Sequence, residues 1–154
     1  MLEFNVMTWD YIAGFFDGEG SLSMKEGSFR ISISQTDENV LKKIKLFTKV
    51  GNICTVTKRK SHWKDAWVYY IANQKDIFYF LSKIKNRVIV KELVISSKLP
   101  LLRAYLEDTK RKRSFLEKRK RYLIKLRTKG LSYRQIGKKA NIDWGFARRV
   151  ILKG

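Results

Sequence analysis

Residues 28–34 alternate strictly between polar and apolar side chains, a pattern that argues against a helix and favours a half-buried β-strand, expected at Phe29–Gln35. The alternation places Phe29, Ile31 and Ile33 on one face of the strand. A second strand, Ser21–Lys25, comes just before it, and the residues between the two strands, Lys-Glu-Gly-Ser, are typical of a turn. We therefore expect an antiparallel hairpin with one face in a core and the other face polar.

The rest of residues 9–99 predicts a second strand pair and the helices around both pairs. Apolar residues at helical spacing and capping side chains predict helices at Trp9–Asp17, from Thr36 or Asp37 to Gly51, at Asp76–Ile84 and at Val88–Leu99. The second strand pair is expected at Ile53–Thr57 and Ala66–Ala72. Gly18 is expected to end the first helix and Pro100 the last. This order predicts an α+β fold with an antiparallel sheet whose helices cover one face.

The charge of the chain restricts its partners. Lys and Arg number 34 against 14 Asp and Glu, a net charge of +20 over 154 residues. Such an excess favours a polyanionic partner, with nucleic acid ahead of an anionic membrane surface. One Cys excludes an internal disulfide, and one Cys with one His excludes a structural zinc site of four such ligands. No apolar run has the length of a membrane span, and no signal peptide is visible. We expect a soluble intracellular protein, cytoplasmic or organellar.

Most of the positive charge lies in the last third of the chain. From Lys110 onward there are 17 basic residues and two acids, a net +15. The composition changes at the charged segment 107–114, so the sequence predicts two domains, 1–108 and 109–154.

The polar face of the predicted hairpin is a candidate DNA-contacting surface. A solvated sheet face is the simpler interpretation, but the charge excess favours contacts to phosphates and base edges. Its residues, with two lysines of the loop that joins the second strand pair, are Ser21, Ser23, Lys25, Arg30, Ser32, Ser34, Lys58 and Lys60.

Residues 12–20 read I-A-G-F-F-D-G-E-G and carry the most specific motif in the chain. Two acids, Asp17 and Glu19, stand where an apolar helix ends and a strand begins. This segment resembles the motif of the LAGLIDADG homing endonucleases. Ala13, Gly14, Asp17 and Gly20 match it, and the other positions differ: Ile12, Phe15, Phe16 and Gly18, with Glu19 in place of the second Asp. The element order αββαββα, with a saddle-shaped sheet, is also similar to that family's core.

The resemblance implies a site-specific, metal-dependent DNA endonuclease that hydrolyses phosphodiesters. In that family the second acid of the motif binds divalent metal, so Glu19 is the expected Mg²⁺ ligand, with Gly18 beside it. Gln35, at the end of its strand, and Lys91 resemble the family's active-site periphery and complete the expected catalytic set. Asp17 is expected to brace the helix end.

Only one copy of the motif is present, and one copy supplies one acid. A working site therefore requires a homodimer, and the resemblance implies that the motif helices form its interface through Ile12, Ala13, Gly14 and Phe16. A twofold protein on duplex DNA predicts a long, near-palindromic target.

The basic tail has the pattern of a small all-α helix-turn-helix module. Ser132 and Gln135 have capping-box spacing, and Asn141 and Asp143 favour a turn followed by a second helix. Apolar sides are predicted for a long basic helix and for the two short ones, at Phe115, Leu116, Tyr122, Leu123, Leu126, Ile136, Ala140, Ile142, Phe146 and Val150. Trp144, Arg148 and Arg149 are expected to contact DNA. The alternative is a helical hairpin that only packs on the core.

Two other functions remain open at this level. Members of the resembled family that are intron-encoded can assist splicing, which would make intron RNA the partner of the same basic surface. A non-catalytic DNA-binding regulator on a relic nuclease scaffold is the third interpretation. The joint presence of Glu19, Gln35 and Lys91 favours the nuclease over the regulator.

Overall fold

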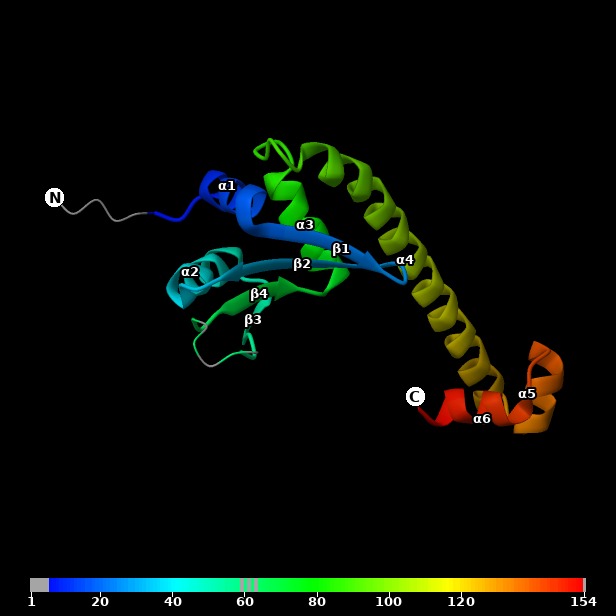
Figure 1. The fold of residues 1–154 in the computed structure, drawn as a ribbon. Coiled ribbons are helices and arrows are strands. Elements are labelled where there is room, and N and C mark those ends of the chain that lie inside the picture. The colour runs from blue at the N-terminus through cyan, green and yellow to red at the C-terminus, as the bar shows by residue number, and fades with distance from the viewer. Residues whose placement is uncertain (1–5, 59, 61, 63, 154) are drawn as a thin grey trace. The chain divides into compact units, whose positions relative to one another are not determined.

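The computed structural model describes residues 6–58, 60, 62 and 64–153 (Figure 1). The chain divides into two units, Met1–Leu106 and Glu107–Gly154. Among the described residues, no helix combines the length and the apolar character that a membrane span needs.

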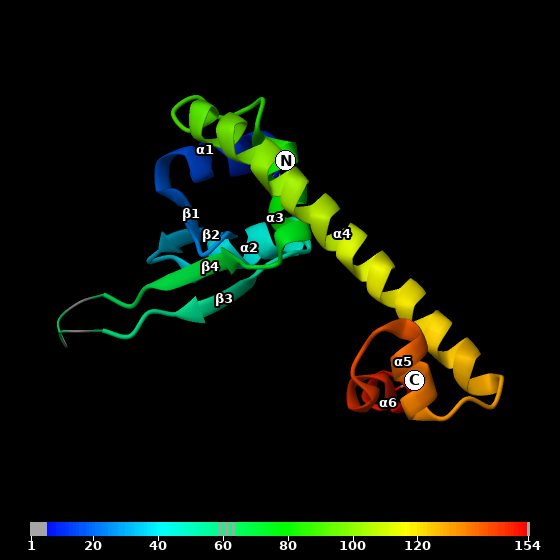
Figure 2. The ribbon, with the colours of Figure 1, turned by 90° about the vertical axis from the view of Figure 1, so that its right-hand side faces the viewer.

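The first unit has the predicted order of elements and the α+β fold. Its elements are α1 (Trp9–Glu19), β1 (Gly20–Lys25), β2 (Ser28–Gln35), α2 (Glu38–Thr48), β3 (Asn52–Thr55), β4 (Trp67–Ile71), α3 (Gln74–Ile84) and the start of α4 (Glu92–Thr128). The four strands form an antiparallel sheet in the order β1-β2-β4-β3. The helices α2 and α3 lie on one face of this sheet (Figure 2).

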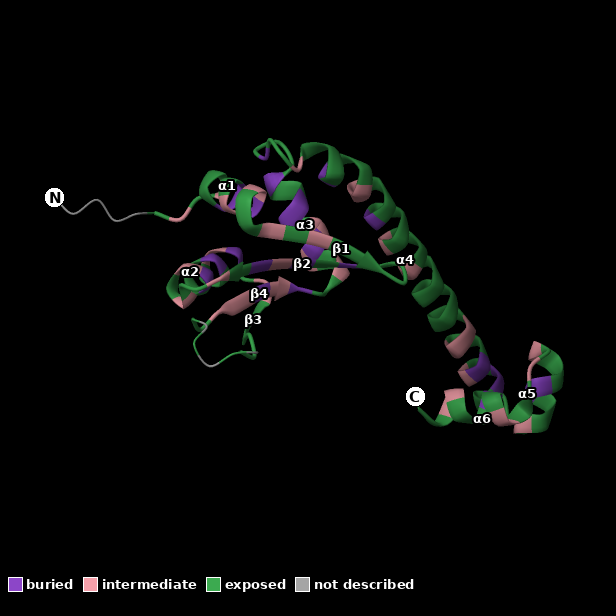
Figure 3. Ribbon diagram, in the orientation of Figure 1, coloured by how far each residue is buried: buried purple, intermediate pink, exposed green. Residues whose placement is uncertain are grey.

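The alternation of β2 has the predicted result. Phe29, Ile31 and Ile33 are buried in a core that they share with the inward side chains of α1, α2, α3 and β4 (Figure 3). The β1–β2 turn holds Glu26 and Gly27 at φ 51° and 77°, the left-handed pair that matches the twist of a two-residue hairpin. Tyr69 also lies in this core, and its hydroxyl donates to the carbonyl of Val50 at 2.9 Å.

Local capping signals place the helix starts, and two predicted helix ends are wrong. Thr8 caps α1 by accepting from the N–H of Tyr11 at 3.2 Å. Gly18 does not end α1, which continues to Glu19 because the extended Gly20 is its C-cap. Likewise α2 ends at Thr48, and its C-cap Lys49, two residues before Gly51, adopts the left-handed conformation itself.

The helix α4 continues through Pro100, contrary to the prediction of a break there. A proline inside a helix removes the hydrogen bond to the carbonyl four residues earlier. Here Pro100 and Ser96 are both exposed, so water is available to the Ser96 carbonyl. The predicted start at Val88 is also wrong, because residues 88–91 precede the helix, which begins at Glu92.

The second unit contains the end of α4, α5 (Tyr133–Ala140) and α6 (Trp144–Leu152). The capping box of Ser132 and Gln135 is present, and Asn141 adopts the left-handed conformation at φ 51°. Asp143 caps α6 by accepting from the N–H of Phe146 at 2.8 Å. A Cβ at Gly137 would lie 2.9 Å from the carbonyl oxygen of Ile142, so the close approach of the two helices requires glycine.

The second unit also has a core of its own, formed by Leu123, Leu126, Ile136 and Ala147. Four of the residues predicted on the apolar sides of these helices are exposed. The exposed fractions of Phe115, Leu116, Tyr122 and Phe146 are 63%, 56%, 44% and 36%. Ala147 is buried in place of Phe146, because two positions one residue apart point to different sides of a helix.

Candidate functional site

The carbonyl end of α1 is where the motif residues meet the sheet. A Cβ at Gly20 would lie 2.1 Å from the ring of Phe16 and 2.6 Å from its carbonyl oxygen, so only glycine fits between helix and strand. The residue before it, Glu19, is the last of the helix. The strand β1 then begins opposite Ile33 of β2. This join therefore fixes Glu19 at one end of the sheet.

Asp17 braces two elements that are distant in sequence. Its carboxylate accepts the backbone N–H groups of Ile89, Val90 and Lys91 at 2.7, 2.8 and 2.8 Å, just before α4 begins. Burial raises the pKa of Asp17, but these three donors and the charge of Lys91 outweigh it and hold the pKa below its ordinary value. The prediction that Asp17 braces the helix end agrees with these contacts, which reach a segment more than 70 residues away.

We expect Asp17→Asn to lower the thermal unfolding midpoint at neutral pH, because a neutral amide cannot replace a charged acceptor of three N–H groups. A carboxyl with a lowered folded-state pKa stabilises the fold above its unfolded pKa of about 3.9, and this contribution is lost at lower pH. The midpoints of wild type and variant should thus converge below about pH 4, as followed by circular dichroism. Asp10→Asn, at an exposed ion pair with Arg87, is the control and should change little. Equal midpoints at pH 7 would contradict the bracing role.

Glu19 has the opposite surroundings. Its side chain is exposed and makes no hydrogen bond or ion pair with any residue that the structure describes. A free carboxylate at the carbonyl end of a helix favours a cation. The carboxylate of Glu19 and the backbone carbonyl of the neighbouring Gly18 are oxygen ligands, the type that Mg²⁺ prefers. They do not suffice in number, because no group of three His, Cys, Asp or Glu residues is gathered within the described parts of the chain.

The other two predicted catalytic residues are near Glu19. Gln35 lies at the same end of the sheet, and Lys91 lies beside the end of α1. Gln35 ends β2, and its amide oxygen accepts from the N–H of Thr36 at 2.8 Å, which leaves the amide NH₂ without a partner among the described residues. The Nζ of Lys91 donates to the carbonyl oxygen of Asp17 and lies 5.8 Å from the centre of the Phe16 ring. An ammonium has three N–H donors, so two remain for another partner.

The exposed side of α1 differs from the predicted interface. Ile12, Ala13 and Phe16 are fully buried in the core of their own chain, so a second chain cannot contact them, and this prediction is wrong. Gly14 does lie on the exposed side, together with Gly18. A Cβ at either glycine would meet nothing within 4 Å, so the chain itself does not need glycine there.

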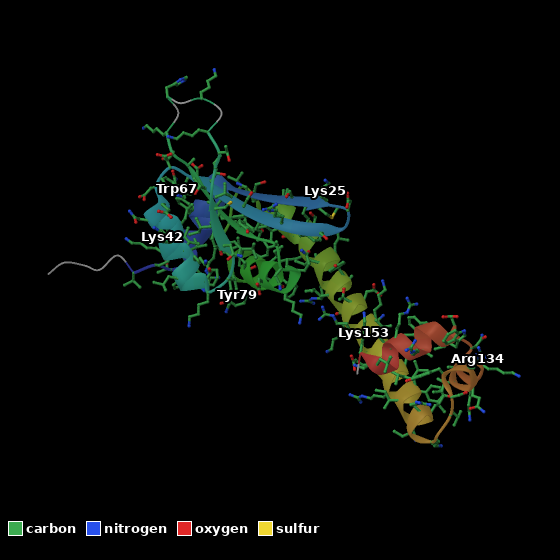
Figure 4. The ribbon with its side chains drawn as sticks, turned by 90° about the horizontal axis from the view of Figure 1, so that it is seen from below. Lys25, Lys42, Trp67, Tyr79, Arg134 and Lys153 are labelled. Atoms are coloured by element: carbon green, nitrogen blue, oxygen red, sulfur yellow. The ribbon has the colours of Figure 1, made fainter. Side chains whose placement is uncertain are left out.

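The outward face of the sheet carries the predicted polar residues. Pairing places Ser23 beside Arg30, and Ser21 beside Ser32, which is paired in turn with Tyr70 of β4. Directly paired residues point to the same face. The predicted members on the two strands are exposed or partly exposed, at Ser21, Ser23, Lys25, Arg30, Ser32 and Ser34. In Figure 4, Lys25 and Trp67 mark opposite ends of the sheet.

Tyr70 is a member of this face that the sequence analysis missed. The guanidinium of Arg30 lies 4.8 Å from the centre of its ring, a cation–π contact between β2 and β4. The alternation of Trp67–Ile71, in which Tyr69 and Ile71 are buried, would have indicated that Tyr70 points outward.

The loop between β3 and β4 leaves the sheet at the end occupied by Gln35, because Gln35 pairs with Trp67 and Trp67 with Thr55. Lys58 forms an ion pair with Asp65 across the base of this loop at 2.8 Å. Lys60 is exposed.

The remaining predicted DNA-contacting residues lie in the second unit. Trp144, Arg148 and Arg149 are all exposed on α6. The guanidinium of Arg134, on α5, lies 5.9 Å from the centre of the Trp144 ring. The sequence analysis did not name Arg134, because its contact with Trp144 depends on how α5 packs against α6.

Comparisons with known proteins address the fold. The model of the LAGLIDADG-like domain matches residues 9–85, half of the chain. No protein with curated annotation matches significantly. The chain resembles the archaeal intron-encoded homing endonuclease I-Vdi141I complexed with DNA, at 20% identity, 94% coverage of both chains and a TM-score of 0.53. It resembles the homing endonuclease I-CvuI in complex with its target in the presence of Ca, at 15% identity, 94% and 92% coverage and a TM-score of 0.52.

A third similar structure is the LAGLIDADG meganuclease I-AabMI bound to uncleaved DNA, at 17% identity and a TM-score of 0.51. The match covers 72% of this chain and 42% of that one. In the match to a further I-CvuI structure, this protein spans 65% of the length of the I-CvuI chain. At these identities the likeness establishes the fold, and the domain match covers the motif helix, both strand pairs and α3. The protein therefore belongs to the family of LAGLIDADG-like domains.

Proposed function

We propose that the protein is a site-specific, double-strand DNA endonuclease that acts as a homodimer with a divalent metal. The observation that carries this proposal is the free carboxylate of Glu19 at the end of a helix whose exposed side contains Gly14 and Gly18. Two glycines four residues apart on an exposed helix face allow another backbone to approach closely.

The number of available metal ligands supports a homodimer. Mg²⁺ takes oxygen ligands in an octahedral arrangement, and one chain offers one free carboxylate here. A twofold axis along the exposed side of α1 would bring the Glu19 side chains of two chains together. The Gly18 carbonyl is the second oxygen that we assign to the metal.

A bound Mg²⁺ would lower the pKa of a water molecule and stabilise the leaving oxygen of a phosphodiester. The residues of the chain have supporting roles. Glu19 would hold the metal, and the free NH₂ group of Gln35 would orient water or phosphate. Lys91 would place its two remaining N–H donors beside the phosphate and offset its charge.

Duplex DNA is the proposed substrate for two reasons. The outward sheet face is lined with hydroxyl groups and with Lys25 and Arg30, a composition suited to phosphates and base edges. Among similar structures with TM-scores above 0.5, I-Vdi141I is complexed with DNA, I-CvuI is in complex with its target and I-AabMI is bound to uncleaved DNA. A twofold protein predicts a near-palindromic target, and a DNA target would place the protein inside the cell, in the cytoplasm or in an organelle.

The test is incubation of the purified protein with DNA of the locus that carries its gene, with Mg²⁺ or with a chelator, followed by end mapping. We expect two staggered or blunt ends at one site, formed only with the metal. Metal-independent cutting, or no cutting at any position of the locus, would contradict the proposal.

We also propose that the second unit binds DNA through Trp144, Arg148 and Arg149. If Arg148 and Arg149 contact bases, Arg148→Ala/Arg149→Ala should relax sequence preference at the outer base pairs, by ~1–3 kcal/mol for each lost bidentate contact. Selection of bound sequences from a randomised duplex library measures this preference. Lys138→Ala/Lys139→Ala, which removes two exposed basic residues of α5, is the matched control. An unchanged preference in the arginine variant would show that these residues do not read bases.

A further inference from the structure

The middle of α4 is a helical surface that the core of the second unit does not use. Residues 110–118 are all exposed, and the buried side chains of that unit begin at Leu123. From Lys110 to Arg121 the chain has eight basic residues and one acid, Glu117. Like charges three and four residues apart repel one another on a helix, so this segment favours a polyanion beside it.

Five basic residues share one side of this helix. At about 100° per residue, Lys110, Arg111, Lys118, Arg121 and Lys125 fall within a sector of about 100° centred near Ser114. We call these five residues the basic stripe. All five are exposed, and their side chains make no ion pair, hydrogen bond or ring contact with any described residue.

Two basic residues on the opposite side of the helix have partners within the second unit. The Nζ of Lys112 lies 2.8 Å from a carboxylate oxygen of Asp108, and the guanidinium of Arg119 lies 5.6 Å from the centre of the Phe146 ring. Seven of the nine basic residues from Lys110 to Lys125 have no partner among the described residues, and five of these seven form the basic stripe.

We propose that the basic stripe binds the phosphate backbone of duplex DNA, as a contact without sequence preference. This inference rests on the proposed function, which makes duplex DNA the partner. From Lys110 to Lys125 the helix rises about 22 Å. Each DNA strand has a phosphate about every 3.4 Å along the duplex axis, so the stripe extends over about six base pairs.

The stripe is tested in the full-length protein with Lys110→Gln/Lys118→Gln/Lys125→Gln. Fluorescence anisotropy with a random-sequence duplex, over a series of NaCl concentrations, gives the slope of log affinity against log salt. Each phosphate contact contributes about 0.9 to this slope, so the triple variant should lose about 2.7. Circular dichroism should show unchanged helix content, because all three side chains are exposed.

The matched control is Lys43→Gln/Lys45→Gln/Lys85→Gln, which removes the same charge from exposed positions on α2 and at the end of α3. Its slope should equal that of the wild type. An unchanged slope in the stripe variant, or an equal loss in the control, would overturn the inference. A loss seen with an RNA hairpin and not with duplex DNA would overturn it as well.

A second readout uses the wild-type protein. Acetylation of lysines, mapped by mass spectrometry, should show Lys110, Lys118 and Lys125 protected by the random duplex, while Lys43 and Lys45 stay reactive. Equal reactivity with and without DNA would overturn the inference. A loss of slope in a protein that does not cut the locus DNA would support the stripe and reject the nuclease. Cutting of the locus DNA, together with an unchanged slope in the stripe variant, would support the nuclease and reject the stripe.

Discussion

Glu19→Gln is expected to abolish DNA cleavage and to leave DNA binding intact. Glutamine keeps the size of the side chain and removes the negative charge that would hold the metal, so hydrolysis should fall by orders of magnitude. The Glu19 side chain makes no hydrogen bond or ion pair with the described part of its own chain, so the fold does not depend on this carboxylate.

Cleavage of a plasmid library with near-palindromic inserts, measured beside anisotropy binding, separates chemistry from affinity. Glu26→Gln is the matched control, because Glu26 is an exposed acid in the β1–β2 turn at the other end of the sheet. The control should cut at the wild-type rate. Wild-type cutting by Glu19→Gln would place the chemistry elsewhere.

Gly14→Leu is expected to convert the proposed dimer into monomers and to remove cleavage with it. Nothing within 4 Å would meet a Cβ at Gly14 inside the chain, so the monomer should fold normally. Between two α1 helices a leucine would overpack the contact, at a cost of ~1–3 kcal/mol.

Light scattering of the DNA-free protein over a range of concentrations measures this change. Ala104→Leu, which adds the same side chain at an exposed position on α4, is the control and should remain a dimer. If the wild type is monomeric in solution and binds its DNA one to one, the interface on α1 is refuted.

Features that depend on neighbouring residues could be predicted from the sequence. The alternation of β2 gave its buried face, and Thr8, Ser132 and Asp143 marked the helix starts, because a cap needs only a side chain and the N–H groups two or three residues ahead. The left-handed turn at Asn141 belongs to the same class.

Features that depend on which side of a helix meets the sheet could not be predicted from the sequence. The motif gave α1 correctly but not its orientation, so Ile12, Ala13 and Phe16 were assigned to an interface although they lie in the core. The course of α4 through Pro100 also depends on tertiary structure, because the proline stands on an exposed side of the helix.

The candidate site was predicted by residue type rather than by contacts. Glu19, Gln35 and Lys91 were named, but the three N–H groups that Asp17 binds lie more than 70 residues away in sequence. The contact between Arg30 and Tyr70 joins β2 to β4, so it depends on a strand register that alternation alone does not give.

The two acids of the motif stand two residues apart on one helix, which turns them about 200° from each other. Asp17 thereby reaches the segment before α4, and Glu19 points into solvent. Deleting Gly18 would rotate the second acid by about 100° relative to Asp17, while the two-residue turn would still hold β1 in its register with β2. The number of residues between the two acids is therefore as important to this site as their identity.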